Sequence, residues 1–361
     1  MFRWGIVGSG FAARKFVLGL RKSEDGLATL VYSRTLKHAQ QFARDFRVAE
    51  AVSDFEAAVR SGKVDAFYIA TPPTLHRLQA VACLAAGKPV LIEKPFAASR
   101  ADAEAIVEAA LANEVFCMEG VWTRFLPLSA RLRALVKEGA IGTPRSLCGS
   151  FGSSNTPDES DNQFQAALAG GALLHRGIYA MAAAFDLLGP AALAASAGTL
   201  GPTGVDEDCS VILRHDGGAL TTLRASLRAP LSNDLTIEGT HGLLKVFAPI
   251  YRPFRMQTIR VRPAGRGQRG NRFVESIREG DLAQGLQQRL GGRIRFPGRG
   301  SRTFVVRYRG NGYHYEADEV ARCVRRGDKQ SALMPLGQSV MMADLMERAR
   351  NSWRSQPWTT P

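Results

Sequence analysis

The sequence predicts two domains. The first is of the α/β class, with a doubly wound parallel sheet, and the second is of the α+β class, with a large and mostly antiparallel sheet. Three observations support this prediction. Short β-rich runs alternate with helical stretches over the first 120 residues, a glycine-rich turn follows the first of these runs, and strand-like runs succeed one another after residue 140. We therefore place the domains at residues 1–120 and 121–361.

The first domain is expected to consist of parallel βαβ units, because helices of ten or more residues separate its strands. Its expected strands are Arg3–Val7, Leu27–Tyr32, Ala66–Ala70, Pro89–Glu93 and Val115–Met118. Its expected helices are Ala12–Arg21, Lys37–Phe46, Leu75–Ala86 and Arg100–Ala112.

The second domain is expected to be antiparallel, because turn-forming residues at His215–Gly218 and Gly239–Gly242 separate strand-like runs. Its expected strands are Arg145–Phe151, Cys209–Leu213, Ala219–Ala225, Leu235–Gly239 and Gly242–Phe247. Its expected helices are Pro127–Glu138, Tyr315–Arg326 and Leu336–Arg350. We expect the last helix to pack back on the first domain.

The net charge of +14 is concentrated in one part of the chain. From Arg252 to Arg309 there are 15 arginines, no lysine and three acids, which gives this segment a net charge of +12. Much of it falls in an Arg- and Gly-rich insertion at about 262–305. Glycines interrupt the arginines, and no aromatic residues alternate with them. We therefore expect an anionic partner or substrate and no specific nucleic-acid binding.

The remaining composition is that of a globular protein, with 45% hydrophobic and 22% charged residues. The most apolar run, Ala180–Ala197, contains Asp186, Gly189 and Pro190, so it indicates a buried segment rather than a membrane span. Because a glycine-rich turn already begins at Gly8, we expect no targeting leader. The five cysteines form no CxxC or Cys/His spacing, which favours reduced thiols, no metal site and a cytoplasmic protein.

The glycine-rich turn predicts a dinucleotide site. Gly8 to Ala13 fits G-x-G-x-x-G/A between a predicted strand and a predicted helix, as in a Rossmann fold. The first glycine permits a tight turn, the second lets the backbone approach a pyrophosphate, and the helix N-terminus faces the phosphates. The residues expected to bind the dinucleotide here are Gly8, Ser9, Gly10, Phe11 and Ala12.

The end of the second strand favours NADP over NAD. An NAD enzyme places an acid there to accept from the ribose 2′-hydroxyl, but this chain has Ser33 and Arg34, with Lys37 nearby. A guanidinium can bind a 2′-phosphate through a forked, charge-assisted contact. We therefore expect NADP, with NAD as the alternative and Arg34 as an ordinary exposed residue in that case.

Two further strands end in residues suited to a site. Thr71, Pro72 and His76 follow the strand at Ala66–Ala70, and Glu93-Lys94-Pro95 ends the strand at Pro89–Glu93. We expect Thr71, Pro72, His76, Glu93 and Lys94 to contact the cofactor, with a helix cap as the alternative role of His76. Ligands lie at the carboxyl ends of strands in such sheets. A desolvated lysine there can act as an acid, a base or an electrostatic clamp.

Together these stretches resemble the Gfo/Idh/MocA family of NAD(P)-dependent oxidoreductases. The resemblance rests on Gly8–Ala13, on Ala70-Thr71-Pro72 with His76, and on Ala86–Pro89 leading to Glu93-Lys94-Pro95. It implies that Lys94 lies beside the nicotinamide and the reacting carbinol. It also implies that Glu93 and Pro95 set the loop, with Pro95 in a cis bond.

Two segments are similar to the dihydrodiol dehydrogenase and NADP-dependent D-xylose dehydrogenase branch. Met118–Pro127 resembles M-E-A-x-W-T-R-F-x-P, which brings Trp122 and Arg124 to the substrate pocket, and Gly170–Tyr179 resembles G-G-A-L-L-D-I-G-V-Y. By this resemblance Tyr179 is the proton-transfer residue. His175 stands where the branch has aspartate and Arg176 where it has an apolar residue, so the substrate and, to a lesser degree, activity remain open.

The resemblance implies reversible oxidation of a secondary carbinol in a sugar, a sugar derivative or a cyclic diol. Tyr179 would exchange the hydroxyl proton, and we expect the Lys94 ammonium to lower the pKa of Tyr179. Trp122, Arg124, His175 and Tyr179 are the expected substrate residues. Two other functions stay open: an NAD-dependent glycosidase of the same family, and a catalytically decayed NADP-binding protein. Family analogy further implies a homodimer or a higher homo-oligomer.

Overall fold

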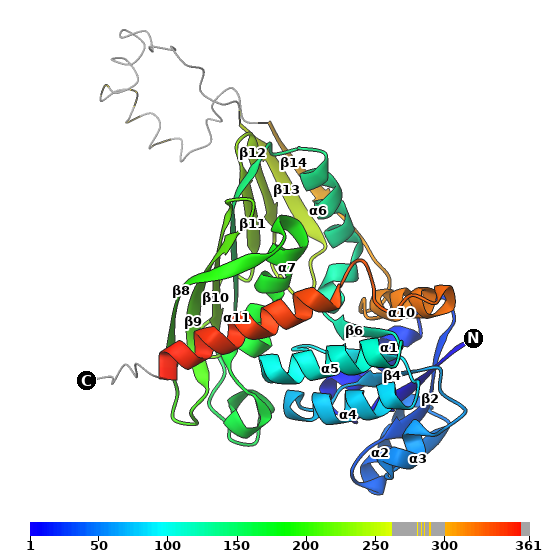
Figure 1. Ribbon diagram of the computed structural model, residues 1–361. Coiled ribbons are helices and arrows are strands. Elements are labelled where there is room, and N and C mark those ends of the chain that lie inside the picture. The colour runs from blue at the N-terminus through cyan, green and yellow to red at the C-terminus, as the bar shows by residue number, and fades with distance from the viewer. Residues whose placement is uncertain (262–279, 281–282, 284, 286–288, 290–299, 355–361) are drawn as a thin grey trace.

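The computed structural model describes residues 1–261 and 300–354 together with residues 280, 283, 285 and 289 (Figure 1). Two sheets organise this part of the chain. A six-stranded parallel sheet with strand order β3-β2-β1-β4-β5-β6 lies in the first third, and an eight-stranded sheet with order β14-β13-β12-β11-β7-β10-β9-β8 follows. The predicted fold class is confirmed.

The parallel sheet reverses its direction of growth between β1 and β4, which is the point where ligands bind in doubly wound folds. Its strands are β1 (Phe2–Val7), β2 (Gly26–Tyr32), β3 (Glu50–Val52), β4 (Ala66–Ile69), β5 (Val90–Glu93) and β6 (Cys117–Gly120). The helices between them are α1 (Phe11–Leu20), α2 (Leu36–Phe46), α3 (Phe55–Val59), α4 (Pro73–Ala85) and α5 (Arg100–Ala112). We propose that the domain boundary lies at residue 120, where β6 ends.

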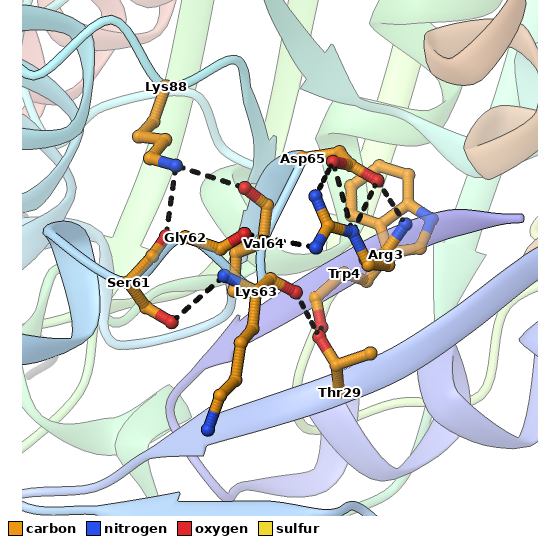
Figure 2. Close-up of polar contacts among 9 residues, drawn as sticks. All are labelled: Arg3, Trp4, Thr29, Ser61, Gly62, Lys63, Val64, Asp65 and Lys88. Atoms are coloured by element: carbon orange, nitrogen blue, oxygen red, sulfur yellow. Dashed lines mark hydrogen bonds and ion pairs between the residues drawn. The ribbon is translucent and has the colours of Figure 1, made fainter.

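Polar contacts hold the amino ends of β1 and β4 together, away from the ligand-binding edge (Figure 2). Asp65 accepts from the Arg3 backbone N–H at 2.8 Å and pairs with the Arg3 guanidinium at 2.5 Å. The Lys88 amine donates to the carbonyls of Ser61 and Val64, each at 3.0 Å. These contacts hold the loops that precede β4 and β5 in place.

The eight-stranded sheet is antiparallel except for the parallel pair β7 and β10. Its strands are β7 (Pro144–Gly152), β8 (Ala191–Leu200), β9 (Asp206–His215), β10 (Leu220–Ser226), β11 (Leu235–Gly239), β12 (Gly242–Val246), β13 (Arg255–Arg260) and β14 (Gly300–Val305). The predicted turns join β9 to β10 and β11 to β12 as hairpins.

Helices connect the two sheets. Short 3-10 segments at Trp122–Phe125, Asn162–Phe164 and Ala166–Leu168 and a π-helical turn at Leu173–Gly177 accompany α6 (Pro127–Lys137), α7 (Ile178–Leu188), α10 (His314–Arg326) and α11 (Leu336–Arg354). Helix α11 runs from the parallel sheet across the eight-stranded one (Figure 1). It contacts both α5 and β8, and Glu347 accepts from the Arg100 N–H at 2.8 Å.

The run Ala180–Ala197 is not one buried segment. Its first part lies in the buried helix α7, whereas its second part forms β8, a strand at the sheet edge whose residues after Ala191 are intermediate or exposed. Gly189 and Pro190 separate the two elements, which is what helix-breaking residues do. The cysteines outside β7 are buried, and all five are free thiols; only Cys148 is exposed.

Candidate active site

The glycine-rich turn offers an open surface to a dinucleotide. Gly8 has φ +103°, and a Cβ there would lie 3.0 Å from the Ala70 carbonyl oxygen, so only glycine fits. At Gly10 a Cβ would meet nothing within 4 Å, and no side chain caps the N-terminus of α1. The first N–H groups of α1 are therefore free to bind the pyrophosphate of a dinucleotide, which fits this cradle.

The end of β2 lies next to this turn. The Gly8 N–H donates to the Tyr32 carbonyl at 2.9 Å, and the Ser9 and Ser33 hydroxyls are 3.3 Å apart. Arg34 and Lys37 follow at the start of α2, and both are exposed. Among the described residues no acidic side chain pairs with Arg34. The structure thus brings the predicted ribose-binding residues to the edge of the predicted phosphate site.

The ends of β4 and β5 are joined by His76. Its Nε2 lies 2.9 Å from the Thr71 carbonyl, and its Nδ1 lies 3.2 Å from the carbonyls of Pro95 and Phe96. His76 is fully buried, which lowers the pKa of its imidazole. His76 thus joins the two loops, and Thr71 and Pro72 beside it are partly exposed.

Lys94 lies at the centre of the predicted site. The Lys94–Pro95 bond is cis, as expected from the resemblance. The ammonium donates to the His175 carbonyl at 3.2 Å and lies 5.1 Å from the centroid of the Tyr179 ring. Burial lowers the pKa of Lys94 to about 8; the Glu93 carboxylate opposes this shift, and the Arg176 guanidinium adds to it.

The Glu93 carboxylate interacts with the Lys94 ammonium next to it. Its Oε2 accepts from the Tyr68 hydroxyl at 2.7 Å, and burial raises the pKa of Glu93 to about 7 against the opposing effect of Lys94. Glu316 from α10 is buried nearby, and neither of its oxygens has a hydrogen-bond partner in the described part of the chain. Burial and the charge of Glu93 hold the pKa of Glu316 well above its usual range.

Tyr179 lies in α7, which packs on the second sheet. At Gly149 of β7 a Cβ would lie 2.9 Å from the Ala180 Cβ, so this glycine lets α7 approach the sheet closely. The Tyr179 ring packs against Phe151 and Tyr251, with centroids 5.7 and 6.3 Å away. Burial and then Glu93 raise the pKa of Tyr179, so the expectation that Lys94 lowers it is wrong for this structure: loss of solvation outweighs the nearby charge.

The π-helical turn before α7 places His175 and Arg176. Asp206 anchors the turn, since its Oδ2 accepts from the Leu173 N–H at 2.7 Å. The Nε2 of His175 is buried without a partner among the described residues. Burial and the charges of Lys94 and Arg176 lower the pKa of His175 to about 3, so its imidazole is neutral.

Comparison with known proteins agrees with this geometry. Residues 2–121 match the family described as "Oxidoreductase family, NAD-binding Rossmann fold", and residues 129–245 match the Gfo/Idh/MocA C-terminal domain. The mouse trans-1,2-dihydrobenzene-1,2-diol dehydrogenase is 31% identical over 97% of this chain and 96% of its own length. The chain belongs to the Gfo/Idh/MocA family. It is therefore an oxidoreductase of the NAD(P)-binding type, as the sequence predicts.

Further similar proteins are also dehydrogenases or reductases. The pig and human trans-1,2-dihydrobenzene-1,2-diol dehydrogenases are 30% and 29% identical, each over 97% of this chain and 96% of its own length. KijD10, a 3-ketoreductase from Actinomadura kijaniata solved with NADP and TDP-benzene, has the same fold with a TM-score of 0.77, 23% identity and 97% coverage of both chains. Levoglucosan dehydrogenase with NADH has a TM-score of 0.81 at 19% identity, over 99% of this chain and 98% of its own.

Two predicted substrate residues of this oxidoreductase are deeply buried. Trp122 stacks on Tyr313 with ring centroids 4.7 Å apart, and its indole lowers the pKa of Tyr179 slightly against the effect of burial. Arg124 lies against a small cavity that Tyr179 also lines, but its guanidinium pairs with Asp186 at 3.3 Å and donates to Gln338 at 2.7 Å. The structure therefore buries Trp122 against Tyr313 and engages Arg124 in contacts within the protein.

Sequence reasoning did not nominate several residues of this family member's site. Phe151, Tyr251 and Tyr68 carry no local motif, and only the strand alternation of β7 could have suggested that Phe151 faces inward. Nothing in the sequence around Glu316 marks this residue as buried. Among the described residues no helix is long and apolar enough to span a bilayer, and no cluster of His, Cys, Asp and Glu could hold a metal ion.

Proposed function

We propose that this chain is an NADP-dependent dehydrogenase or reductase acting on a secondary carbinol of a sugar, a sugar derivative or a cyclic diol. One observation carries the proposal. The Lys94 ammonium, at the carboxyl end of β5, lies 5.1 Å from the centroid of the Tyr179 ring, at the same edge of the parallel sheet as the N-terminus of α1. A cation and a phenol at this edge of the sheet suit proton transfer to or from the oxygen of a carbinol.

Proton transfer falls to Tyr179. Burial keeps its phenol protonated across the neutral range, so in the reductive direction it donates its proton to the carbonyl oxygen. Lys94, still an ammonium at neutral pH, stabilises the negative charge that develops on the same oxygen. When bound, the nicotinamide supplies or accepts the hydride. In the oxidative direction the Tyr179 phenolate receives the hydroxyl proton, so the phenol must first lose its own proton to solvent; the raised pKa of Tyr179 makes this direction less favourable at neutral pH.

The preference for NADP rests on the end of β2. Arg34 is exposed and free of acidic partners among the described residues, and Ser33 contacts Ser9 beside the phosphate cradle. Lys37 lies in the first turn of α2, three positions further along the chain. Because the Arg34 guanidinium has no acidic partner to release among the described residues, it can bind a 2′-phosphate at little cost in free energy.

Turnover of trial substrates tests the proposal. The full chain is mixed with NADP or NAD and with trans-1,2-dihydrobenzene-1,2-diol, levoglucosan or D-xylose, while the absorbance of the reduced nicotinamide is followed. We expect reduction of NADP that is lost in Lys94→Met. Sugar release from a glycoside without net cofactor change would instead identify a glycosidase. Tight NADP binding with no turnover of any of these polyols would identify a decayed enzyme.

A cytoplasmic location and a homodimer or larger assembly complete the proposal. The free and mostly buried thiols support a reducing compartment. The outward face of β9 and β10 supports self-association, because Ile212 and Leu220 are exposed there. Light scattering after gel filtration tests the assembly, and a monomer at micromolar concentration would refute that part.

A further inference from the structure

Arg176 is a partly buried cation without an acidic partner. Its Nη2 donates to the Ser153 hydroxyl at 3.3 Å, and its guanidinium carbon lies 4.8 Å from the Phe151 ring. Its buried Nε has no hydrogen-bond partner, and no carboxylate lies within ion-pair distance, among the residues that the structure describes. Asp161 attracts it only from a longer range.

Three other arginines that are shielded from solvent have acids, whereas Arg252, like Arg176, has a buried Nε without a hydrogen-bond partner among the described residues. Asp186 pairs with Arg124 at 3.3 Å and with Arg133 at 2.7 Å, and Asp206 pairs with Arg350 at 3.7 Å. A shielded charge without a counter-ion is costly, so proteins keep one mainly where a ligand supplies the opposite charge. Arg176 is in that position.

The guanidinium of Arg176 lies near the catalytic pair. The Phe151 ring contacts both Arg176 and Tyr179: its centroid lies 4.8 Å from the Arg176 guanidinium carbon and 5.7 Å from the centroid of the Tyr179 ring. Lys94 lies over the Tyr179 ring, and the positive charge of Arg176 acts on Lys94. The spacing across a single aromatic ring suits a group a few bonds from the reacting carbinol.

His175, next to Arg176, also differs from the family motif in a way that makes the site less negative. In the motif that Gly170–Tyr179 resembles, His175 replaces an aspartate and Arg176 replaces an apolar residue. His175 is neutral and presents a buried, unpartnered Nε2. One change removes a negative charge from the site and the other adds a positive charge, and both favour an anion.

We propose that Arg176 binds an anionic oxygen group of the substrate, a carboxylate or a phosphate, so that the preferred substrate is an acidic sugar or polyol. This inference rests on the proposed function, since it assumes that Lys94 and Tyr179 act on a carbinol. The planar guanidinium forms two parallel hydrogen bonds with either group, and its unpartnered Nε is one of the donors in that contact. His175 then donates to, or accepts from, a hydroxyl without repelling the anion.

Calorimetry on the full chain saturated with NADPH tests the inference. The probes are D-glucose, D-glucuronate and D-glucose 6-phosphate, and we expect at least one acid to bind about 10- to 100-fold more tightly than glucose. Tighter binding of glucuronate alone identifies a carboxylate site, and tighter binding of the phosphate alone identifies a phosphate site. Equal binding of all three probes, or no binding of either acid, overturns the inference.

Variants assign the effect to one residue. Arg176→Met should remove the preference for the acid, Arg176→Lys should keep part of it, and Arg214→Met, which deletes an exposed charge of β9, should keep all of it. The double change His175→Asp and Arg176→Ile should reverse the preference in favour of glucose. NADPH affinity verifies that each variant is folded. An acid preference that survives Arg176→Met overturns the inference.

Failure of this inference and failure of the proposed function have different signatures. Turnover of a neutral diol that depends on Tyr179, with no preference for acids, overturns only the anion site. If no trial substrate is turned over, although NADPH binds and acids are still preferred, the proposed function is overturned and only an anion-binding pocket remains.

Discussion

Replacing Arg34 with alanine tests whether this side chain selects the cofactor. Arg34 follows β2 directly, is exposed and pairs with no acid among the described residues, so binding a 2′-phosphate breaks no existing contact. A charge-assisted hydrogen bond changes a dissociation constant by about 10- to 100-fold. Because salt screens an exposed charge, we expect the lower end of this range at physiological ionic strength and a larger effect at low salt.

Titration of the quenching or enhancement of NADPH and NADH fluorescence measures the effect. Arg34→Ala should weaken NADPH by about tenfold or more and leave NADH nearly unchanged. Arg44→Ala is the matched control, since it removes an exposed charge from the last turn of α2, the helix that follows Arg34; there Arg44 donates to Gln41. Equal losses for both cofactors, or the same loss in Arg44→Ala, would refute the assignment.

Three further predictions concern pH, charge and backbone strain. Since the pKa of Lys94 is about 8, its charge is present below this pH and lost above it; carbonyl reduction should fall about tenfold per pH unit above 8 in the wild type but not in Lys94→Arg, as initial rates will show. The basic segment Arg252–Arg309 should bind duplex DNA only weakly, with an affinity that drops steeply with salt; sequence-selective binding at physiological salt would contradict this. Gly171→Ala should lower the free energy of unfolding in urea by about 1–3 kcal/mol because of the positive φ at this position, and by more because the new Cβ meets Asp206. Gly139→Ala is the control: with φ +69° and open space around it, this change measures the backbone effect alone.

The sequence was sufficient for the parallel sheet because local patterns there are strong. Each strand of β1, β2, β4 and β5 is an apolar run, and the glycine turn marks the switch point. The short elements β3 and α3 were missed, since three to five residues carry too little periodicity. Strand β8 was missed because its alanines have no β preference; pairing with β9 forms it.

The site was predictable where a motif carries it. Lys94 and Tyr179 lie together although 85 positions separate their numbers, and only the resemblance pointed to that pairing. What the sequence could not supply is solvation. The burial that raises the pKa of Tyr179 and isolates Arg176 from acids depends on how α7 packs on β7, which is a tertiary contact. The basic insertion lies mostly outside the described residues, so its predicted anionic partner stays a prediction.

The central claim is that Lys94 and Tyr179 form the chemical centre, and Tyr179→Phe tests it most directly. The change removes one hydroxyl and keeps the ring that packs on Phe151 and Tyr251. We expect kcat with NADPH and the best carbonyl substrate to fall by about 10²–10⁴-fold while the dissociation constant of NADPH stays that of the wild type. Turnover that survives Tyr179→Phe unchanged would contradict the claim and leave only the cofactor site in place.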